Sequence, residues 1–490
     1  MLREGRFNEK MNPEASEYTS SMKDDIRLFE AVTKINVAHV KMLSECGIIS
    51  DSDSEEILNA LSELKEEGID SLNLSDELED IHMAIEDYVV NKVGKEVGGK
   101  LHTAKSRNDQ VSGAIRITLR EEILDIQDKL IKMIESLMEL AEENKDVIMP
   151  GHTHLQVAEP TTFAHHLNSY SWAFSRALNK LRDNYSQTNA SPLGACALSG
   201  TSFPIDRELM SELLGFERLV NNTIDAVGTR DFVLQIMSNL SILMSNLGRL
   251  AEEILLWNST EFDMIEIPDE YASTSSIMPQ KKNPEVAEIA RAKAGKSIGN
   301  LTSSLSIMKT LPQAYNLDLQ EITPLLWNSI DEAKSSLRIM SKFIREIEPK
   351  PEKMLEHTEK GFSNATELAD TLVRENDVSF REAHAIVGKL IVKALDEEKE
   401  LRELTQEDLE SVSQEVIDKE ISLTKEKFEK ALDLENCVEA RKVTGGPSPE
   451  KVGEELEELE NKMKEIKREL SDKRETLSKI ENKLFGEKGS

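Results

Sequence analysis

The sequence predicts an all-α protein whose centre is a bundle of long helices, with smaller helical domains on its N- and C-terminal sides. Two observations support this fold class. Aromatic residues make up 4% of the chain, while Leu, Glu, Lys, Ile and Ala are abundant, and such a composition favours helices. Several long stretches also carry apolar residues at alternating steps of three and four, which is the period of one helical face.

The chain has 490 residues, which exceeds the usual size of a single hydrophobic core. We therefore expect several units arranged in order along the chain. They are an N-terminal helical domain at 1–106, a central long-helix bundle at 107–350, a C-terminal helical domain at 351–447 and a charged, heptad-patterned helical tail at 448–490.

The net charge of −32, from 92 acidic and 60 basic residues, argues against nucleic acid or an anionic membrane surface as a partner. Such acidity also suits a saline cytoplasm, and an activity optimum at low salt would contradict that idea. Cys46, Cys196 and Cys437 are far apart and form no C-x-x-C pair, which suggests a reducing compartment. The chain has no apolar run of roughly 18 residues, so we expect a cytoplasmic protein without a membrane span.

The N-terminal region shows short helical patterns broken by polar turns. In the run E-D-I-H-M-A-I-E from Glu79 to Glu86, Ile81 and Ile85 share a helical face, and His82 is interpreted as flanking that packed stripe. The segment Y-T-S-S-M-K-D-D-I-R-L, from Tyr18 to Leu28, lies upstream.

The first long helix is expected over about 107–144, after the glycine-led run G-G-K-L-H-T-A-K-S-R-N-D-Q-V at 98–111. The S-R-N-D-Q part of this run is typical of a capped helix start. The apolar seam that follows consists of Ile115, Leu119, Ile123, Ile126, Leu130, Met133, Leu137 and Leu140.

The run M-P-G-H-T-H-L-Q-V-A-E-P, from Met149 to Pro160, is predicted to form a proline-bounded turn before the next helical pattern. His152 and His154, together with the pair His165-His166, resemble a metal-binding cluster. No carboxylate or thiolate stands at a recognisable ligand spacing, however, so we expect no metal.

Two further long helices are expected after a loop-like region at 189–222. The first follows the run D-A-V-G-T-R-D-F at 225–232, and its seam is Val233, Ile236, Leu240, Leu243, Leu247, Leu250, Ile254 and Trp257. The second spans about 285–309, with a seam of Val286, Ala290, Ala294, Ile298, Leu301, Leu305 and Met308. The tail carries a heptad seam from Val452 to Leu484, which is compatible with packing on the chain's own body or with a coiled-coil contact.

The stretch from Tyr271 to Glu288 reads Y-A-S-T-S-S-I-M-P-Q-K-K-N-P-E-V-A-E. Five small residues suit a loop that can move, and Pro284 opens a helical pattern. Hydroxyls, an amide and two lysines are thereby gathered at a helix N-terminus, where free N–H groups and the helix dipole favour an anion. The stretch therefore predicts a site for a carboxylate substrate.

The motif S-S-I-M-P-Q-K-K-N-P closely resembles the signature loop of the fumarase/aspartase superfamily, and specifically that of the argininosuccinate lyase family. Fumarase and aspartase loops resemble S-S-x-M-P-G-K-x-N instead. Thr274 stands where the family commonly has Gly. The resemblance continues through S-R-N-D-Q, through T-H-L-Q at 153–156, and through K-T-L-P-Q-A-Y-N-L-D-L-Q-E at 309–321, so it covers roughly 15–447.

The resemblance implies β-elimination, in which argininosuccinate is cleaved to arginine and fumarate through an aci-carboxylate carbanion, in arginine biosynthesis. It implies that Ser275 is the base and that Lys281 and Asn283 hold the reacting carboxylate. His154 would then handle a proton, with Glu288 orienting it. The expected substrate ligands are Ser21, Arg107, Asn108, Thr153, Arg230, Tyr315 and Gln320.

Four departures besides Thr274 bear on the expected site. Lys105 replaces a common Arg, His152 replaces Tyr, Glu159 replaces Gln, and Thr323 stands where many members have a substrate-holding Lys. Neither a Walker loop nor G-x-G-x-x-G is present, and no cofactor is expected. Two alternatives stay open: a related lyase acting on adenylosuccinate or aspartate, and a non-catalytic structural protein of the same fold.

A helix over 107–144 is about 55 Å long, so Asn108 and the His154 turn should lie at opposite ends of the bundle. Since the following helices run back and forth, we expect the Ser275 loop at the His154 end and Arg230 and Tyr315 at the Asn108 end. Association through the bundles would bring opposite ends of different chains together. The resemblance implies a homotetramer whose active sites each draw on three chains.

Overall fold

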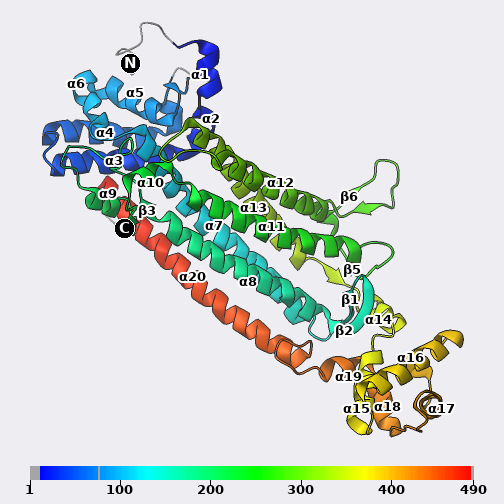
Figure 1. Cartoon of the computed structure of the whole chain (residues 1–490). Helices are drawn as coiled ribbons and strands as arrows, with labels where there is room; N and C mark the ends of the chain where they lie inside the picture. The colour runs from blue at the N-terminus through cyan, green and yellow to red at the C-terminus, as the bar shows by residue number, and fades with distance from the viewer. Residues whose placement is uncertain (1–10, 76–77, 487–490) are drawn as a thin grey trace.

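The computed structural model describes residues 11–75 and 78–486. Long helices lie side by side at its centre, short helices cover one end, and a smaller helical unit stands at the other end (Figure 1). The all-α fold class is thereby confirmed. The bundle helices are α7 (Arg107–Glu143), α8 (Phe163–Thr188), α11 (Asp231–Trp257), α12 (Glu285–Met308) and α13 (Ile322–Arg345).

Helix α7 begins where the sequence predicts. The Ser106 side chain accepts a hydrogen bond from the backbone of the first turn, and Asp109 accepts one from the Ser106 N–H, which completes a capping box. The predicted seam from Ile115 to Leu140 is buried along the whole helix. Helix α7 packs against α8 and α13, and α12 packs against α11 and α13.

Successive bundle helices run in opposite directions (Figure 1). The connections that follow α7 and α11 therefore lie at one end of the bundle, and those that follow α8 and α12 lie at the other. At the second end lie the N-terminal helices and 3-10 turns: α1 (Pro13–Thr19), α2 (Met22–Asp25), η1 (Ile26–Leu28), α3 (Phe29–Glu45), α4 (Asp51–Glu67), η2 (Ile69–Ser71), α5 (Ile81–Val93), α6 (Lys95–Gly98) and η4 (Gly99–His102).

The C-terminal helices enclose a buried apolar cluster of their own, between Leu368 and Leu432, while the N-terminal helices share the apolar cluster of the bundle. The elements of this region are α14 (Pro351–Lys360), α15 (Ala365–Glu375), α16 (Phe380–Asp396), η7 (Leu401–Glu403), α17 (Gln406–Ile417), α18 (Lys425–Leu432) and α19 (Leu434–Glu439).

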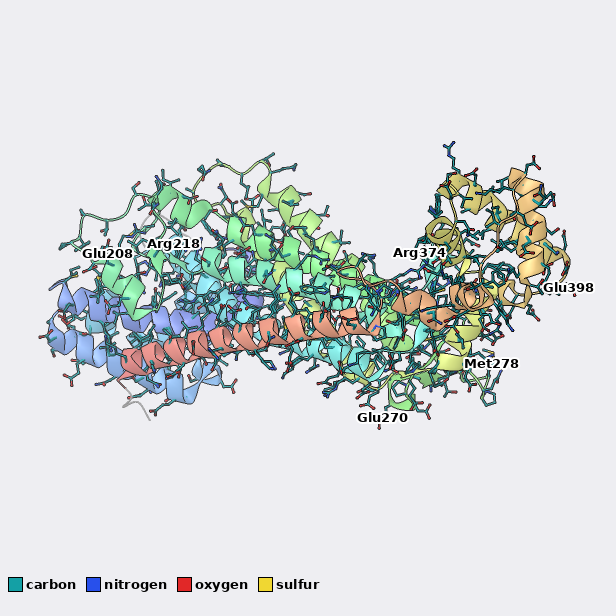
Figure 2. The ribbon with its side chains drawn as sticks, turned by 90° about the horizontal axis from the view of Figure 1, so that it is seen from below. Glu208, Arg218, Glu270, Met278, Arg374 and Glu398 are labelled. Atoms are coloured by element: carbon teal, nitrogen blue, oxygen red, sulfur yellow. The ribbon has the colours of Figure 1, made fainter. Side chains whose placement is uncertain are left out.

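Helix α20 (Pro449–Phe485) returns along the outside of the bundle (Figure 2). It contacts α8, α7 and α3, and Lys34 Nζ lies 2.8 Å from the Glu481 carboxylate near its end. The side chains that it buries are Val452, Leu456, Leu459, Met463, Ile466, Leu470 and Leu484. Of the two alternatives for the tail, packing on the chain's own body is the one observed.

The connections contain short strands that the sequence did not indicate. The predicted turn at 149–160 is an antiparallel hairpin of β1 (Ile148–Thr153) and β2 (Gln156–Thr162). The remaining pairs and short helices are β3 (Ala190–Ser191) with β4 (Arg218–Leu219), β5 (Ile265–Glu266) with β8 (Glu348–Pro349), β6 (Ser273–Thr274) with β7 (Lys282–Asn283), α9 (Arg207–Leu213), α10 (Thr223–Gly228), η5 (Asp269–Tyr271) and η6 (Leu317–Glu321).

Helix α12 buries only part of its predicted seam. The residues that it packs inward are small, namely Ala287, Ala290, Ala294, Ser297 and Ser304, and they let α11 approach closely. Ile298 and Leu305, which were expected on the seam, are 48% and 49% exposed, and Ile289 is 56% exposed. The predicted seam of α12 is therefore buried at Ala290 and Ala294 but uncovered at Ile298 and Leu305 in the single chain.

Candidate active site

The predicted site residues fall into groups at the two ends of the bundle. Thr153 and His154 lie in the β1–β2 hairpin, and Ser275 lies in the β6–β7 loop, at the end where α7 and α11 finish (Figure 1). Arg107 and Arg230 stand where α7 and α11 begin, beside the N-terminal helices. The predicted separation between the Asn108 end and the His154 end is therefore present in the single chain.

The Ser275 hydroxyl is held by the backbone of its own loop. Its Oγ accepts hydrogen bonds from the N–H groups of Ile277, at 3.3 Å, and Met278, at 3.1 Å. Two N–H dipoles aimed at one oxygen stabilise negative charge on that oxygen. The N–H groups expected from the helix start at Pro284 thus come from the loop itself.

The two neighbouring lysines of this loop have different environments. Lys282 Nζ lies 2.8 Å from both the Glu266 and Asp269 carboxylates and anchors the base of the loop. Lys281 is exposed and forms no ion pair within the described ranges, so its charge is available to a ligand. The tip of the loop is open, with Ile277 86% exposed, and Met278 lies at the bundle end opposite the N-terminal helices (Figure 2).

Asn283 and Glu288 lie beside this loop. The Asn283 amide is 3.4 Å from the Ser273 Oγ, which in turn donates to Glu285, so a small network orients it. Glu288 is in the first turn of α12 and is exposed. In the part of the chain that the structure describes, no hydrogen bond joins Glu288 to His154.

His154 occupies the tip of the β1–β2 hairpin, directly after Thr153. The two residues between the paired Thr153 and Gln156 are His154 and Leu155, and both have positive φ, at 56° and 58°. The His154 side chain is exposed and borders a cavity of about 460 Å³. The hairpin can thereby present the His154 imidazole to the surface of another chain or to a ligand.

At the other end, Ser21 and Arg107 belong to one polar cluster. The Ser21 hydroxyl donates to the Asp25 carboxylate, and its backbone N–H donates to the Glu79 carbonyl at 3.0 Å. Arg107 forms an ion pair with Asp80, the residue that caps α5. Asn108 donates to the Ala197 carbonyl at 3.0 Å, so its amide is already oriented.

Arg230 and Tyr315 lie close to each other and to the polar cluster of Ser21 and Arg107. Arg230 is 1% exposed and donates to the Val227 and Thr229 carbonyls at 3.2 and 2.8 Å, and burial lowers the pKa of its guanidinium to about 10. Burial also raises the pKa of Tyr315 above its ordinary value, against the opposing charge of Arg230. Gln320 donates to the Thr19 carbonyl at 3.1 Å and so connects η6 to the N-terminal segment.

Two carboxylates of this cluster were not among the predicted residues. Asp25 is 6% exposed, and burial raises its pKa to about 7, although the hydrogen bond from Ser21 opposes the shift. Asp80 is buried beside it and shares the Arg107 charge. Both ring nitrogens of His82 are buried and have no hydrogen-bond partner among residues 11–75 and 78–486, and burial keeps its pKa well below the ordinary value. The helical pattern of the E-D-I-H run, which contains Asp80 and His82, predicts packing and not a polar cluster.

The histidines near the hairpin are engaged in other contacts. His165 Nδ1 lies 2.8 Å from the Thr161 Oγ1, and His166 Nε2 lies 2.6 Å from the Glu253 carboxylate. Over residues 11–75 and 78–486, no three His, Cys, Asp or Glu side chains are arranged to hold a metal ion.

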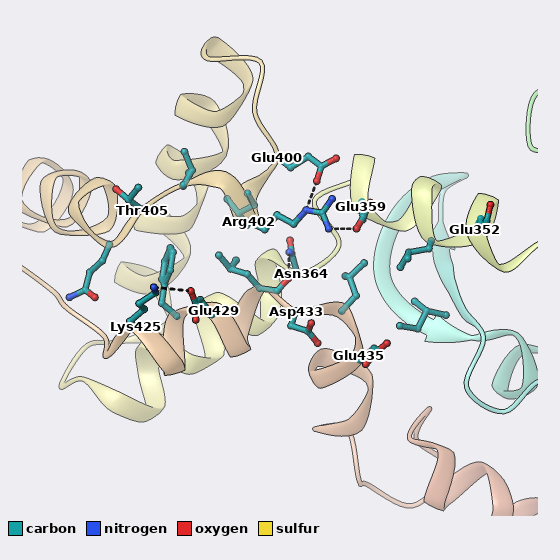
Figure 3. A pocket seen from close by; sticks show the side chains of 18 of the residues that line it. Glu352, Glu359, Asn364, Glu400, Arg402, Thr405, Lys425, Glu429, Asp433 and Glu435 are labelled. Atoms are coloured by element: carbon teal, nitrogen blue, oxygen red, sulfur yellow. Dashed lines mark hydrogen bonds and ion pairs between the residues drawn. The ribbon is translucent and has the colours of Figure 1, made fainter.

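A cavity of about 950 Å³ lies between the C-terminal helices and the start of β1. Arg402 lies within it between Glu359 and Glu400, at 2.5 and 2.7 Å (Figure 3). None of the predicted site residues lines this cavity.

Thr323, at the position where many family members carry a Lys, is 7% exposed in the first turn of α13.

No helix in the described ranges is long and apolar enough to cross a membrane.

Comparison with known proteins extends these observations to nearly the whole chain. A family model described as "Lyase" matches residues 5–299, and one described as "Argininosuccinate lyase C-terminal" matches residues 362–439. The argininosuccinate lyase of Methanocaldococcus jannaschii is 43% identical over 99% of both chains. That of Methanothermobacter thermautotrophicus is 45% identical over 94% of this chain and 98% of the relative.

Solved structures show the same architecture. An EDDS lyase crystallised with formate superposes with a TM-score of 0.87 at 28% identity, covering 94% of this chain and 91% of the other. The class II fumarase of Schistosoma mansoni shares the fold alone, with a TM-score of 0.72 at 18% identity over 88% and 93% of the two chains. Because family models match residues 5–299 and 362–439 and the two argininosuccinate lyases cover 99% and 94% of its length, the chain belongs to the argininosuccinate lyase family of the fumarase/aspartase superfamily.

Proposed function

We propose that this chain is an argininosuccinate lyase and cleaves argininosuccinate to arginine and fumarate in arginine biosynthesis. Two relatives that carry this name align with 99% and 94% of the chain, at 43% and 45% identity. The observation that carries the proposal is the Ser275 loop, in which two backbone N–H groups reach the hydroxyl oxygen and Lys281 stands unpaired among the described residues.

The reaction is an elimination whose barrier lies in removing a weakly acidic proton next to a carboxylate. Ser275 takes this proton, because the N–H groups of Ile277 and Met278 stabilise the charge on its oxygen. Lys281 and Asn283 hold the reacting carboxylate and stabilise the aci-carboxylate that develops. His154 handles the proton of the departing nitrogen, and Glu288, from a different chain, orients it.

The remaining groups of the substrate are two further carboxylates, an amine and the guanidinium. Ser21, Arg107, Asn108, Thr153, Arg230, Tyr315 and Gln320 are the proposed ligands. Arg230 is held in place by the Val227 and Thr229 carbonyls, and its charge acts on the neighbouring Tyr315. The chemistry uses no cofactor or metal, and EDTA should leave the rate unchanged.

We also propose a cytoplasmic homotetramer with active sites shared between chains. The predicted ligands lie at the two ends of a helix of 37 residues, which is about 55 Å long. Ile298 and Leu305, seven residues apart on one face of α12, are 48% and 49% exposed, which is suited to a contact between bundles. Bundles that associate in antiparallel fashion would bring the two ends together.

A fumarate assay tests the function directly. Fumarate release is followed by absorbance, with argininosuccinate, adenylosuccinate and aspartate offered separately at equal concentrations. We expect turnover with argininosuccinate and a far lower rate with the others. Turnover of adenylosuccinate or aspartate alone would assign the chain to a related lyase, and no turnover of any substrate by the assembled protein would favour the non-catalytic alternative.

A further inference from the structure

The turn that carries His154 has few contacts at its own tip. Positive φ at both central residues of a two-residue hairpin is the requirement of a type I′ turn, and side chains as large as His and Leu adopt it rarely. Leu155 is 74% exposed, and no hydrogen bond to the His154 side chain is found among the described residues. The position of the His154 imidazole therefore depends on the contacts that hold strands β1 and β2.

Strand β2 lies directly against the C-terminal end of α14. Gly361 follows α14, and a Cβ added there would lie 2.3 Å from Cγ1 and 2.4 Å from Cβ of Val157. Any side chain at this position would push the strand away. Helix α14 contacts β1 and β2 and lies beside the hairpin (Figure 3).

A single arginine connects the same strand to two C-terminal helices. Arg441, which follows α19, has its Nε 3.8 Å from the Glu159 carboxylate of β2 and its Nη1 3.9 Å from the Glu367 carboxylate of α15. It also donates to the Cys437 carbonyl of α19. The side chains of Arg441 and Glu367 are 18% and 9% exposed, so little water screens this contact.

The chain beyond Arg441 stays next to the hairpin base. His165 Nε2 lies 3.0 Å from the Gly445 carbonyl, while its Nδ1 meets Thr161 at the end of β2. The segment 441–445 therefore follows β2 from Glu159 toward the start of α8. Glu159, where the family commonly has Gln, matches the opposite charge of Arg441.

We propose that Arg441 is a positioning residue for His154. By holding Glu159, it fixes the hairpin on the C-terminal helices and so sets the place at which the turn presents the imidazole. The inference rests on the proposed role of His154 in the reaction. It assigns to the C-terminal helices a function in turnover, through a residue that does not touch the substrate.

The test compares Arg441→Gln with Arg374→Gln in the full-length assembled protein. Arg374 is the matched control, because it also pairs with Glu367, at 2.5 Å, yet its recorded partners, Glu367 and Thr371, both lie within α15. Arg441→Gln should lower kcat about 10–100-fold through misplacement of the imidazole, with little change in KM. Arg374→Gln should keep both constants.

A second pair of variants keeps the test decisive if Arg441→Gln does not fold. Glu159 is half exposed on its strand, so Glu159→Ala should fold and should show the same loss in kcat. Glu159→Asp, which keeps the carboxylate charge, should retain more of the turnover than Glu159→Ala. The double variant Glu159→Ala with Arg441→Gln should be no slower than Arg441→Gln alone, because both changes remove the same contact between Arg441 and Glu159.

Three results would overturn the proposal: equal losses in Arg441→Gln and Arg374→Gln, a change confined to KM, or unchanged kcat in Glu159→Ala. His154→Asn separates this failure from failure of the proposed reaction. Slow turnover in His154→Asn with normal Arg441→Gln would remove only the positioning role. Full turnover in His154→Asn would remove the role of the imidazole itself.

Discussion

Asn108 and His154 lie at opposite ends of the same helix. Asn108 is in the first turn of α7, and His154 is at the tip of the hairpin that follows its last turn. The 37 residues between Arg107 and Glu143 span about 55 Å. No small substrate bridges that distance. If both residues act on one substrate molecule, they must come from different chains.

Replacement of Ser275 by Ala should leave folding intact and reduce turnover by several orders of magnitude. The side chain lies in an open loop and its hydroxyl accepts only loop N–H groups, so it contributes little to stability. The neighbouring exposed Ser276 supplies the control, since Ser276→Ala should keep most of the activity. Fumarate release and the thermal midpoint are measured together. Near-normal turnover in Ser275→Ala would contradict its role as base.

The two adjacent lysines should differ in their effects. Lys281→Met should cost about 3–4 kcal/mol of transition-state stabilisation, which is typical of a strong electrostatic contact in such a site. Lys282→Met removes the anchor to Glu266 and Asp269, so it should loosen the loop and raise KM with a smaller loss of kcat. Steady-state kinetics of both variants provide the comparison. A larger kcat loss in Lys282→Met would reverse the assignment.

Asp25 should make the protein less stable as the pH rises. Desolvation raises its folded-state pKa from 3.8 to about 7, so in this interval the folded chain binds a proton that the unfolded chain releases. The free energy of unfolding should therefore fall between about pH 4 and pH 7 by an amount on the order of a few kcal/mol.

Asp25→Asn should flatten this dependence and should be more stable than the parent at pH 8. Urea unfolding at several pH values measures the slope, with the exposed Asp24→Asn as control. An unchanged slope in Asp25→Asn would mean that this carboxyl is ionised throughout the range.

Removal of α20 should destabilise the chain although none of the proposed site residues lies in it. Fully burying an apolar side chain of this size contributes about 1.5–3 kcal/mol, and α20 buries seven of them. Leu459→Asp should lower the thermal midpoint strongly, while Glu458→Ala, on the exposed face, should not. A truncation at Gly446 with an unchanged midpoint would show that the packing of α20 is dispensable.

The long helices could be predicted because their apolar seams are local. The cap at Ser106 and the seam from Ile115 to Leu140 specify α7 without knowledge of its partners. The β1–β2 hairpin could not be predicted in this way, since Pro150 and Gly151 weaken the strand pattern and contacts with Gly361 and Arg441 hold the strands. Periodicity likewise could not tell that Ile298 would be exposed.

The candidate site likewise contains features that the local sequence predicts and features that depend on distant contacts. The Ser275 loop stands out as a continuous motif, and the family resemblance selects Lys281, whereas the anchoring role of Lys282 emerges only when Glu266 and Asp269 are placed in space. Asp25 gave no signal, because one more acid is unremarkable in a chain with 92 of them. Burial is what makes it unusual, and burial depends on the fold.

The most direct test of shared sites uses two inactive proteins. Ser275→Ala and His154→Asn are purified separately, dissociated, mixed and allowed to reassemble, and fumarate release is compared with each protein treated alone. If Ser275 and His154 of one site come from different chains, some mixed sites regain both native residues and activity returns only in the mixture. Absence of recovery, in samples where native mass spectrometry demonstrates mixed oligomers, would show that one chain supplies both groups.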